Sequence, residues 1–555
     1  MLEFFAAVFL IFAWLIPDHY PPWSSFYNES AAALGLMLMA LVPGRRWLIA
    51  KVSWAGVSVV AVALLPVLQW ALGLLDYSGD AWISALYLLG FAAAIATGQV
   101  WASAGTRHSA AVLSTAALAG SLISSALALV QYLELGTLDG YLVALFPGAH
   151  AAANLGQPNN LGTLIGIGVV GLLLLREQGR LGTAAGSAAL ALLLVGAGAT
   201  QSRTALLFGP LILLGLWLAR RAGVGIKTPS STVVAATVFH WLVTLAWPLL
   251  QTALLLSAPT SIVGRSLSTG RFAAWTLLLD AASHAPWQGF GWLRVGAAQL
   301  SVANSYPPIS EKIWFHAHNL FLDFVLWCGY PLGLLLSGLV VYWLVERARK
   351  TMTLEAMTGM LVVAIFGVHA MLELPHHYAY FLIPVGLWIG QVEHGMSSRF
   401  TMPASWMLAP MVLAGVMVVE IWREYPAVEE DFRLLRFELL RIGTLRATEP
   451  APSAPMLSSL TGFLRFARTT PHEAMSEVEL KAMEASVQRY GYAPSMFRYA
   501  QALALNGHLD DAKRVFLEIR HVHGEKSYGR YRQALHEAIV EGKSGLVDLE
   551  TTLPP

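Results

Sequence analysis

The chain has 555 residues and a formal net charge of +1, with 56% hydrophobic and only 12% charged residues. A soluble protein of this length carries about a quarter charged residues, so the composition excludes a soluble enzyme and indicates a polytopic membrane protein. The near-neutral charge gives no reason to expect a nucleic-acid partner. The single cysteine, Cys328, excludes a disulfide framework and a cysteine-based metal site.

Apolar runs separated by polar breaks predict about 13 transmembrane helices, of which the first two are short. The predicted ranges are 2–16, 30–43, 53–74, 82–103, 109–133, 157–175, 183–200, 204–219, 233–256, 318–345, 355–374, 378–393 and 404–421. The first range has no basic start and no small-residue cleavage site, so we expect it to remain as a helix rather than to be removed as a signal peptide. The fold class is therefore an all-α polytopic membrane protein.

Basic residues predict which loops face the cytoplasm. One set of loops holds Arg45, Arg46, Lys51, Arg107, Arg176, Arg180, Arg220, Arg221, Lys227, Arg347, Arg349, Lys350 and Arg399, whereas the opposite loops up to residue 422 hold only Arg203, Arg265, Arg271, Arg294 and Lys312. The first set marks the cytoplasmic side, which places the N-terminus inside and the C-terminus outside. Basic residues on the outer side are exceptions that usually have a local cause, such as an anionic ligand or an acidic partner. Arg203 and Arg271 both lie beside polar motifs.

The predicted helices divide the chain into four segments. These are N-terminal transmembrane helices (1–256), an outer loop (257–317), C-terminal transmembrane helices (318–421) and an outer helical tail (422–555). Within the tail, Ala447–Pro455 is a proline-rich linker. The segment Tyr499–Phe516 has the small residues and glycine turn of one tetratricopeptide-like helix pair, although a generic helical cap explains a single repeat as well.

The first polar motif on the outer side is Gln157-Pro158-Asn159-Asn160, at the start of the sixth predicted helix. Proline and asparagine are ordinary residues at a helix N-terminus. A structural cap and a binding site therefore both remain open for this motif.

The second motif is Gln201-Ser202-Arg203-Thr204, in a very short outer turn between two apolar helices. A charge deep in hydrocarbon costs about 3 kcal/mol on insertion scales. An anionic ligand would offset this cost, and arginine suits phosphate because its planar fork donates two parallel hydrogen bonds. The alternative is an arginine that extends to the outer interface.

The third motif is Ser268-Thr269-Gly270-Arg271, followed by a segment that ends in Trp275. The glycine lets the backbone turn just before an expected interfacial helix. Backbone amides at the start of that helix would then lie beside Arg271, which favours an anion site.

The fourth motif contains His316, His318 and Asn319, directly before a long apolar run. Histidine titrates near neutrality, with an unperturbed pKa of about 6.5, so it can accept a proton where membrane meets water. Helix capping is the structural alternative for this motif.

The next outer loop carries a related set of polar side chains. His369 and Glu373 are four residues apart and are expected on one face of the eleventh helix. Pro375 then ends that helix, and the rim residues His376, Tyr378 and Tyr380 follow. No HExxH pattern accompanies these histidines, so we do not expect a metal site. Together the four motifs predict an outward-facing cavity with two arginines for a phosphate-bearing lipid and a histidine for proton transfer.

These motifs resemble the O-antigen ligase/polymerase (Wzy_C-like) superfamily of membrane glycosyltransferases, and most closely its PglL/PilO-type protein O-oligosaccharyltransferases. The superfamily pattern of His-Asn with spaced leucine and glycine is matched by His318, Asn319, Leu322, Gly329 and Gly333. The Ser202-Arg203-Thr204 turn and the Gly270-Arg271 pair before Trp275 match as well. The stretches 157–160 and 369–382 are more particular to the protein-glycosylating branch.

The resemblance implies a GT-C-like enzyme of the bacterial inner membrane whose active site faces the periplasm. A glycan would pass en bloc from undecaprenyl pyrophosphate to a serine or threonine of a periplasmic protein or pilin, with inversion and without a cofactor or metal. The implied catalytic residues are His318, Arg271 and Arg203. The implied donor- and acceptor-binding residues are Gln157, Asn159, Asn160, His316, Asn319, His369, Glu373, Tyr378 and Tyr380.

One position departs from the family pattern. The family often has a glutamate nine residues after the motif histidine, where this chain has Trp327. Asp323, one turn earlier on the same helix face, is the residue that would compensate. Two other functions stay open: a ligase or polymerase that passes glycan to lipid A core or to a lipid-linked chain, and a transporter without catalysis. The outer-rim position of the polar motifs and the lack of evident repeats argue against the transporter.

Overall fold

A computed structural model describes residues 1–133, 140–145, 149–256, 270–309, 311–394, 400–440 and 449–554. Arg265, Ser268, Thr269, Arg399 and the first two residues of the 447–455 linker lie outside the described residues. The described chain is mostly α-helical and forms two compact units. Unit 1 combines Met1–Ala63, Leu86–Ser266 and Val341–Val418, and unit 2 combines Leu64–Ala85, Leu267–Val340 and Val419–Pro555.

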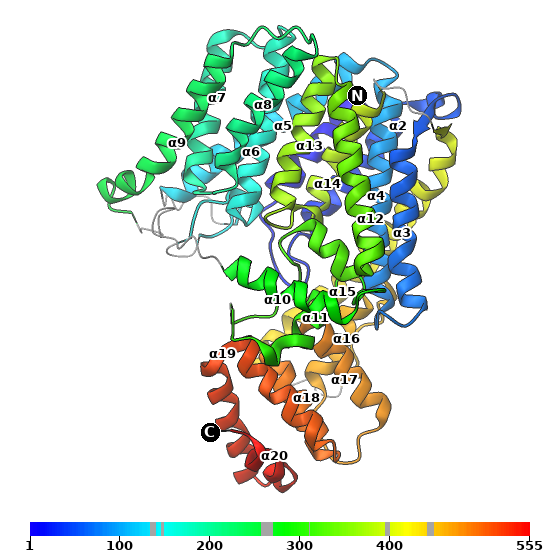
Figure 1. The fold of residues 1–555 in the computed structure, drawn as a ribbon, viewed down its shortest axis with the longest axis vertical. Coiled ribbons are helices and arrows are strands. Elements are labelled where there is room, and N and C mark those ends of the chain that lie inside the picture. The colour runs from blue at the N-terminus through cyan, green and yellow to red at the C-terminus, as the bar shows by residue number, and fades with distance from the viewer. Residues whose placement is uncertain are drawn as a thin grey trace. The chain divides into compact units, whose positions relative to one another are not determined.

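Unit 1 contains most of the predicted apolar helices (Figure 1). Its helices are α1 (Leu2–Leu15), α2 (Phe26–Leu41), α5 (Thr106–Tyr132), α6 (Pro158–Glu177), α7 (Thr183–Ala199), α8 (Phe208–Arg221), α9 (Ser230–Ala253), α13 (Leu354–Ala370) and α14 (Ala379–His394). Two short strands, β1 (Lys51–Ser53) and β2 (Thr401–Pro403), pair antiparallel with Val52 opposite Met402. The unit boundaries fall inside α3 (Trp54–Ala71), α4 (Ser78–Ala102), α12 (Leu320–Lys350) and α15 (Leu408–Leu439).

Within the described residues, seven helices are long and apolar enough to cross a membrane. They are Trp54–Ala71, Ser78–Ala102, Thr106–Tyr132, Pro158–Glu177, Ser230–Ala253, Leu320–Lys350 and Ala404–Leu439. The prediction of a mostly helical membrane protein is therefore confirmed. Each of the thirteen predicted ranges overlaps an α-helix, but the number of membrane crossings stays a prediction.

Small residues let α5 and α6 approach closely in the core of unit 1. A Cβ on Gly171 would lie 2.9 Å from the carbonyl oxygen of Ser114, so only glycine fits there. The Ser121 hydroxyl also donates to the carbonyl of Leu164 across the interface, at 2.8 Å. In a membrane the hydrophobic effect does not drive helices together, because lipid tails are as apolar as the side chains. Close packing of small residues and interhelical hydrogen bonds stabilise such helix pairs instead.

A fully buried ion pair joins the end of α12 to α14 in unit 1. Arg347 donates to both carboxylate oxygens of Glu393, at 2.6 and 2.9 Å, and neither side chain is exposed. The Trp343 indole donates to the same carboxylate at 2.7 Å. The bidentate geometry pairs the two buried charges directly, so the pair fixes how the two helices meet.

Removing one partner of this pair is expected to destabilise unit 1. Arg347→Ala leaves the Glu393 carboxylate buried without its cation, at a cost of about 3–5 kcal/mol. We expect a lower melting temperature and a smaller monodisperse fraction of the full-length protein in detergent. Arg349→Ala removes an exposed arginine two residues away and serves as the control. Equal melting temperatures for the two variants would show that the Arg347–Glu393 ion pair does not stabilise the protein.

Unit 2 contains the tail and the described residues 270–309 and 311–317 of the segment that was predicted as the outer loop. Its helices are α10 (Gly270–His284), α11 (Val295–Val302), α16 (Ser458–Arg468), α17 (Glu477–Tyr490), α18 (Ala493–Leu505), α19 (Leu509–Val540) and α20 (Val547–Thr552), with the parts of α3, α4, α12 and α15 given above. Helix α15 continues unbroken to Leu439, past residue 422 where the tail was expected to begin. The residues after 422 keep forming helix because their charges pair along it, as in the Glu430–Arg433 ion pair (2.6 Å).

The tail and the outer loop share one hydrophobic core. Helices α18 and α19 form the hairpin expected around Gly507, which has a positive φ of 82° at the turn, and they lie side by side in Figure 1. Buried Leu300 of α11 and Ile313 pack in the same cluster as Met496 and Phe516 of the hairpin. The tail is thus part of the same compact body as the loop that carries the histidine motif.

An ion pair and a hydrogen bond attach this body to the first turn of α4 inside unit 2. Arg489 of α17 pairs with Asp80 at 2.8 Å, and both side chains are largely buried. The Ser458 hydroxyl accepts from the backbone amide of Gly79 at 2.8 Å. Arg468 forms a bidentate pair with Asp431 at 2.8 and 2.9 Å, which holds α16 against α15.

Burial raises the pKa of Glu518 on α19 to about 7, although Arg514 at 3.2 Å opposes the shift. Between the usual carboxyl pKa and 7, the folded state binds more protons than the unfolded state. The stability that this protonation provides is therefore lost as the pH rises through about 7.

Glu518→Gln is expected to stabilise unit 2 at about pH 8 by on the order of 2 kcal/mol, and to have little effect at about pH 5. Hydrogen-exchange protection factors of α19 in the full-length chain measure this difference. Glu541→Gln, which changes an exposed carboxylate after the same helix, is the control. A Glu518→Gln effect of the same size at both pH values would contradict the assigned shift.

Candidate functional site

The structure brings three of the polar motifs together at Asn159, on the first turn of α6. Its side-chain amide donates to Glu373 at 3.1 Å, and its side-chain oxygen accepts from the Ser202 hydroxyl at 2.7 Å. Asn159 thus links residues that are 214 and 43 positions away in the chain. The 157–160, 201–204 and 369–382 motifs therefore belong to one polar site in unit 1.

The same face of α6 makes two further contacts with the 369–380 segment. The Asn160 amide donates to the Tyr380 hydroxyl at 3.1 Å, and Thr163 hydrogen-bonds His369 at 2.8 Å. The rings of Tyr378 and Tyr380 stack with centroids 5.0 Å apart. Thr163 was missed in the sequence, although it follows Asn159 and Asn160 at helical spacing on the same face.

Helix α13 ends at Ala370, so Glu373 does not lie on the helix face where it was expected. Pro375 excludes helical geometry for the residue before it and begins a short 3-10 turn, η5 (Pro375–His377). The amide of Glu373 still donates to the carbonyl of His369, at 2.8 Å, which keeps both residues at the same polar site. The side chain of Glu373 is buried.

Arg203 lies, half-buried, in the turn after α7. Gln201 before it has a positive φ of 49°, and its amide donates to the carbonyl of Thr244 on α9 at 2.9 Å. Ser202 after Gln201 is held by Asn159, as described above. Arg203 therefore projects from a turn that is fixed from two sides. Gln157 is the N-cap residue of α6, two residues before Asn159 at the same polar site.

In unit 2, the His316–Asn319 segment is held from both sides of Ala317. The Trp275 indole of α10 donates to the Ala317 carbonyl at 2.8 Å, and the Ala317 amide donates to Asp323 at 2.8 Å. His318 follows with a positive φ of 53°. A non-glycine residue in this region is strained, and such strain concentrates at functional sites.

Two neighbouring groups complete this segment. Asn319 caps α12, because its side-chain oxygen accepts from the amides of Phe321 and Leu322 at 3.1 and 3.2 Å. The rings of His316 and His318 are 4.2 Å apart, and the Trp314 ring lies 5.4 Å from His318. The cap interpretation thus applies to Asn319, while His318 projects from the turn before the helix.

Arg271 lies on the first turn of α10, four residues before Trp275. The indole of Trp275 therefore attaches the helix that carries Arg271 to the residue directly before His318. This link between the third and fourth motifs was not predicted, because it depends on a contact between a side chain and a backbone carbonyl that lie 42 residues apart.

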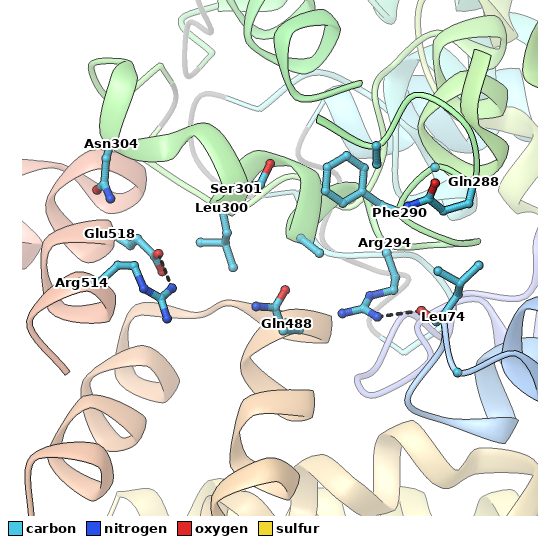
Figure 2. A pocket seen from close by; sticks show the side chains of 14 residues that line it. Leu74, Gln288, Phe290, Arg294, Leu300, Ser301, Asn304, Gln488, Arg514 and Glu518 are labelled. Atoms are coloured by element: carbon cyan, nitrogen blue, oxygen red, sulfur yellow. Dashed lines mark hydrogen bonds and ion pairs between the residues drawn. The ribbon is translucent and has the colours of Figure 1, made fainter. Parts of the chain in front are cut away.

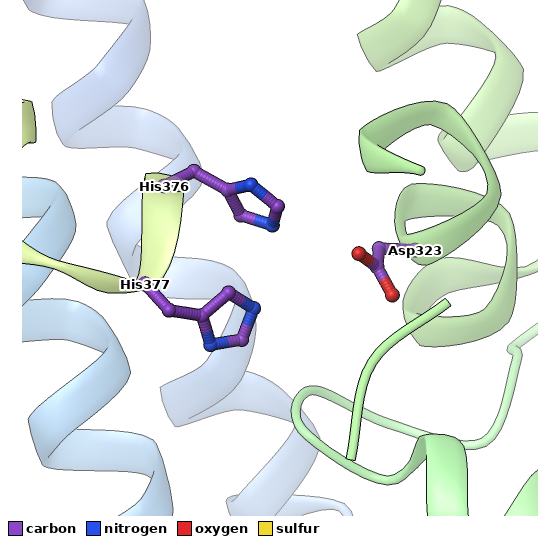
Figure 3. A group of neighbouring side chains, drawn as sticks. All are labelled: Asp323, His376 and His377. Carbon is purple, nitrogen blue, oxygen red and sulfur yellow. The ribbon is translucent and has the colours of Figure 1, made fainter. Parts of the chain in front are cut away.

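Figure 3 shows three more polar side chains of the motifs. His376 and His377 follow one another in η5 of unit 1, with ring centroids 4.6 Å apart. Asp323, in unit 2, lies on the first turn of α12 and is fully buried. Its carboxylate fixes the backbone before His318, which is a positioning role that the sequence did not specify.

Trp327, which stands where the family often has glutamate, is a packing residue. Its ring lies 4.5 Å from that of Trp292, and the side chain is buried. Its carbonyl accepts from the Gln69 amide at 2.7 Å. Gln69 also accepts from the Trp292 amide at 2.9 Å, so one side chain joins α3 to the break in α12.

The comparisons with known proteins agree with these motifs. The family of O-antigen ligases matches residues 188–337, and the family described as the C-terminal part of virulence factor membrane-bound polymerases matches residues 357–536. A general O-oligosaccharyltransferase of Acinetobacter baylyi is 29% identical over 552 residues, which cover 95% of this chain and 93% of that protein. A ComP-specific O-oligosaccharyltransferase of the same organism is 32% identical over 274 residues, 49% of each chain.

The first family match contains Arg203, Arg271 and His318, and the second contains the 369–382 stretch. The apolar helices and these matches define a membrane protein of the glycan-transferring kind. The chain is therefore similar to the O-antigen ligases over residues 188–337 and to an O-oligosaccharyltransferase along nearly its whole length. The resemblance inferred from the motifs is therefore confirmed.

Proposed function

We propose that this chain transfers an oligosaccharide en bloc from undecaprenyl pyrophosphate to serine or threonine hydroxyls of periplasmic proteins or pilin. The similarity to two relatives named as O-oligosaccharyltransferases supports this activity, and one of them matches along nearly the whole chain. The structural observation that supports it best is the fixed His318, strained at a positive φ between Ala317 and the cap residue Asn319.

His318 accepts the proton of the acceptor hydroxyl as its oxygen attacks the anomeric carbon. The bond between that carbon and the pyrophosphate oxygen breaks, so the configuration inverts and undecaprenyl pyrophosphate leaves. Arg203 and Arg271 bind the pyrophosphate and stabilise the negative charge that develops on it. The reaction needs no metal or cofactor.

The remaining motif residues bind and position donor and acceptor. Gln157, Tyr378 and Tyr380 border the polar site around Asn159 and suit hydroxyl-rich ligands, because they offer amide and phenol groups. His316, Asn160, His369 and Glu373 belong to the same binding role. Asn319 and Asp323 act on the backbone beside His318 and are positioning residues.

The enzyme lies in the inner membrane, with 13 spans, a cytoplasmic N-terminus, and the 257–317 loop and the tail in the periplasm. The distribution of basic residues supports this orientation. Arg203 and Arg271 then face the periplasm, where the lipid-linked glycan and the acceptor protein meet.

Expression in a bacterium that makes a lipid-linked glycan but lacks its own ligase tests this function. A candidate pilin is co-expressed, and glycan blots with peptide mass spectrometry identify the modified molecule. We expect glycan on serine or threonine of the pilin, and its loss in Arg203→Ala and Arg271→Ala at unchanged protein levels. Lys312→Ala is the control, because it removes an exposed cationic side chain from the same loop and should keep the activity.

The similarity to O-antigen ligases and to membrane-bound polymerases makes a ligase or a polymerase the alternative. Glycan on lipid A core, or longer lipid-linked chains with an unmodified pilin, would establish one of these functions instead. If both arginine variants kept full activity, the site assignment would be wrong although the family would stand.

A further inference from the structure

A groove of about 440 Å³ lies within unit 2, and no residue of the histidine motif lines it (Figure 2). Its lining comes from three parts of the unit: residues 73–74 after α3, residues 285–304 around α11, and helices α17 and α19 of the tail. The volume lies in the range of ligand-binding pockets. Neither the family motifs nor the proposed mechanism uses it.

Three side-chain amides line this groove with free hydrogen-bonding capacity. Gln288, Asn304 and Gln488 make no side-chain hydrogen bond to any other described residue, and Gln288 and Asn304 are exposed. Each amide offers two N–H donors and one carbonyl acceptor. This combination matches a ligand that alternates donors and acceptors, as a polypeptide backbone does.

The charged groups of the groove are already paired. Arg294 donates to the Leu74 carbonyl at 2.7 Å and pairs with Asp76 at 3.3 Å. Arg514 pairs with Glu518 at 3.2 Å and with Asp511 at 3.0 Å. Because each guanidinium has its own acid, the groove lacks the excess positive charge that a phosphate or a nucleic acid would require.

The labelled lining side chains are spread along a row in Figure 2, with hydrogen-bonding groups toward both ends. In Figure 2, Asn304, Arg514 and Glu518 lie toward one end, and Gln288 and Arg294 lie toward the other. Leu300 lies between them and supplies an apolar contact. Phe290 is the single aromatic side chain among the described residues that line the groove, so open ring faces for stacking sugars are scarce.

Helix α11 connects the groove to the histidine segment inside the same unit. Ala297, Leu300 and Ser301 of this helix line the groove. Gln299, on another face, accepts from the amide of Trp314 at 2.7 Å and donates to the carbonyl of Lys312 at 3.3 Å. A ligand in the groove would therefore bind beside the helix that positions the segment leading to His318.

We propose that this groove binds an extended, overall uncharged segment of the acceptor protein, at a distance from the hydroxyl that receives the glycan. The inference rests on the proposed protein O-glycosylation. Gln288, Asn304 and Gln488 pair with peptide groups of the segment, and Leu300 contacts an apolar side chain between them. The groove thereby gives the enzyme a preference for whole acceptor proteins over short peptides that contain the same hydroxyl.

The kinetic test uses the full-length enzyme in nanodiscs with lipid-linked glycan, a pilin acceptor and a short peptide around its modified serine. The readout is the ratio of kcat/KM for the pilin to kcat/KM for the peptide. We expect the Asn304→Ala/Gln488→Ala variant to lower this ratio about tenfold, because two hydrogen bonds to the acceptor are lost. Gln533→Ala, an exposed glutamine of α19 outside the groove, should keep the wild-type ratio. An unchanged ratio in the double variant would overturn the proposal.

A photo-crosslinking test reads binding without requiring transfer. A benzophenone amino acid replaces Gln488 or, as the control, Gln533, and the enzyme is irradiated with the pilin and with lipid-linked glycan separately. Crosslinks from position 488 to the pilin would support the proposal, whereas crosslinks to the glycan alone, or to neither, would overturn it. If the wild type transferred no glycan to protein, the proposed function would fail, and the pilin crosslink would still decide whether the groove binds this polypeptide.

Discussion

His318→Ala is expected to lower glycan transfer about 10²- to 10⁴-fold, the usual contribution of a general base. The acceptor hydroxyl must lose its proton as it attacks, and alanine offers no group that accepts it. The backbone around the site should persist, because Trp275 and Asp323 hold Ala317 through main-chain atoms that the substitution leaves in place. Transfer to a pilin by the purified enzyme measures the effect.

A second substitution, His318→Gly, distinguishes the loss of a proton acceptor from a change in backbone strain. Glycine adopts the positive φ of 53° at position 318 without steric cost, so His318→Gly should be at least as stable as His318→Ala and equally inactive. His284→Ala, at the exposed end of α10, is the control and should retain activity. If His318→Gly kept the wild-type rate, the histidine would not be the base. If His316→Ala were the more damaging change, the role would pass to His316.

Gly329→Ala is expected to lower the free energy of unfolding by at least about 3 kcal/mol and to reduce the yield of folded protein. Position 329 has a positive φ, and a Cβ there would meet the backbone of a neighbouring loop. Its φ of 75° interrupts α12, and a Cβ there would lie 2.5 Å from the carbonyl carbon of Trp287 and 2.8 Å from the carbonyl oxygen of Pro286. These atoms belong to backbone and cannot move aside like a flexible side chain.

The loop that blocks position 329 is tied to the break in α12 on both sides. The amide of Phe290 donates to the carbonyl of Leu326 at 2.7 Å, and the amide of Tyr330 donates to the carbonyl of Pro286 at 2.8 Å. Gly338→Ala on the same helix is the matched control, since a Cβ there meets nothing within 4 Å. Melting temperatures and yields of the two variants in detergent measure the difference. A Gly329→Ala protein as stable as Gly338→Ala would show that position 329 does not require glycine.

The helices were predictable because each apolar run must satisfy its own backbone hydrogen bonds in a membrane. The predicted range 109–133, for example, corresponds to α5 at Thr106–Tyr132. Helix α15 was predicted too short, because hydrophobicity marks the end of an apolar run and not the end of a helix. The charged residues after position 421 continue the same helix to Leu439.

The site was only partly predictable from the sequence. The motifs supplied the residues, but their pairing depends on contacts between distant parts of the chain. Asn159 with Glu373 and Gln69 with Trp327 are separated by 214 and 258 positions. Local patterns carry no information on such pairs. The structure explains why the superfamily pattern has a glycine at position 329. At Gly329 the backbone of the loop before α11 contacts the break in α12.

En bloc transfer to protein can be measured by the intact mass of a purified pilin after incubation with the full-length enzyme and a lipid-linked glycan of known mass. We expect one mass increase equal to the whole glycan, located on a serine or threonine, absent without the lipid-linked donor and absent with His318→Ala. A series of single-sugar increments, or an unmodified pilin beside elongated lipid-linked glycan, would contradict en bloc transfer to protein.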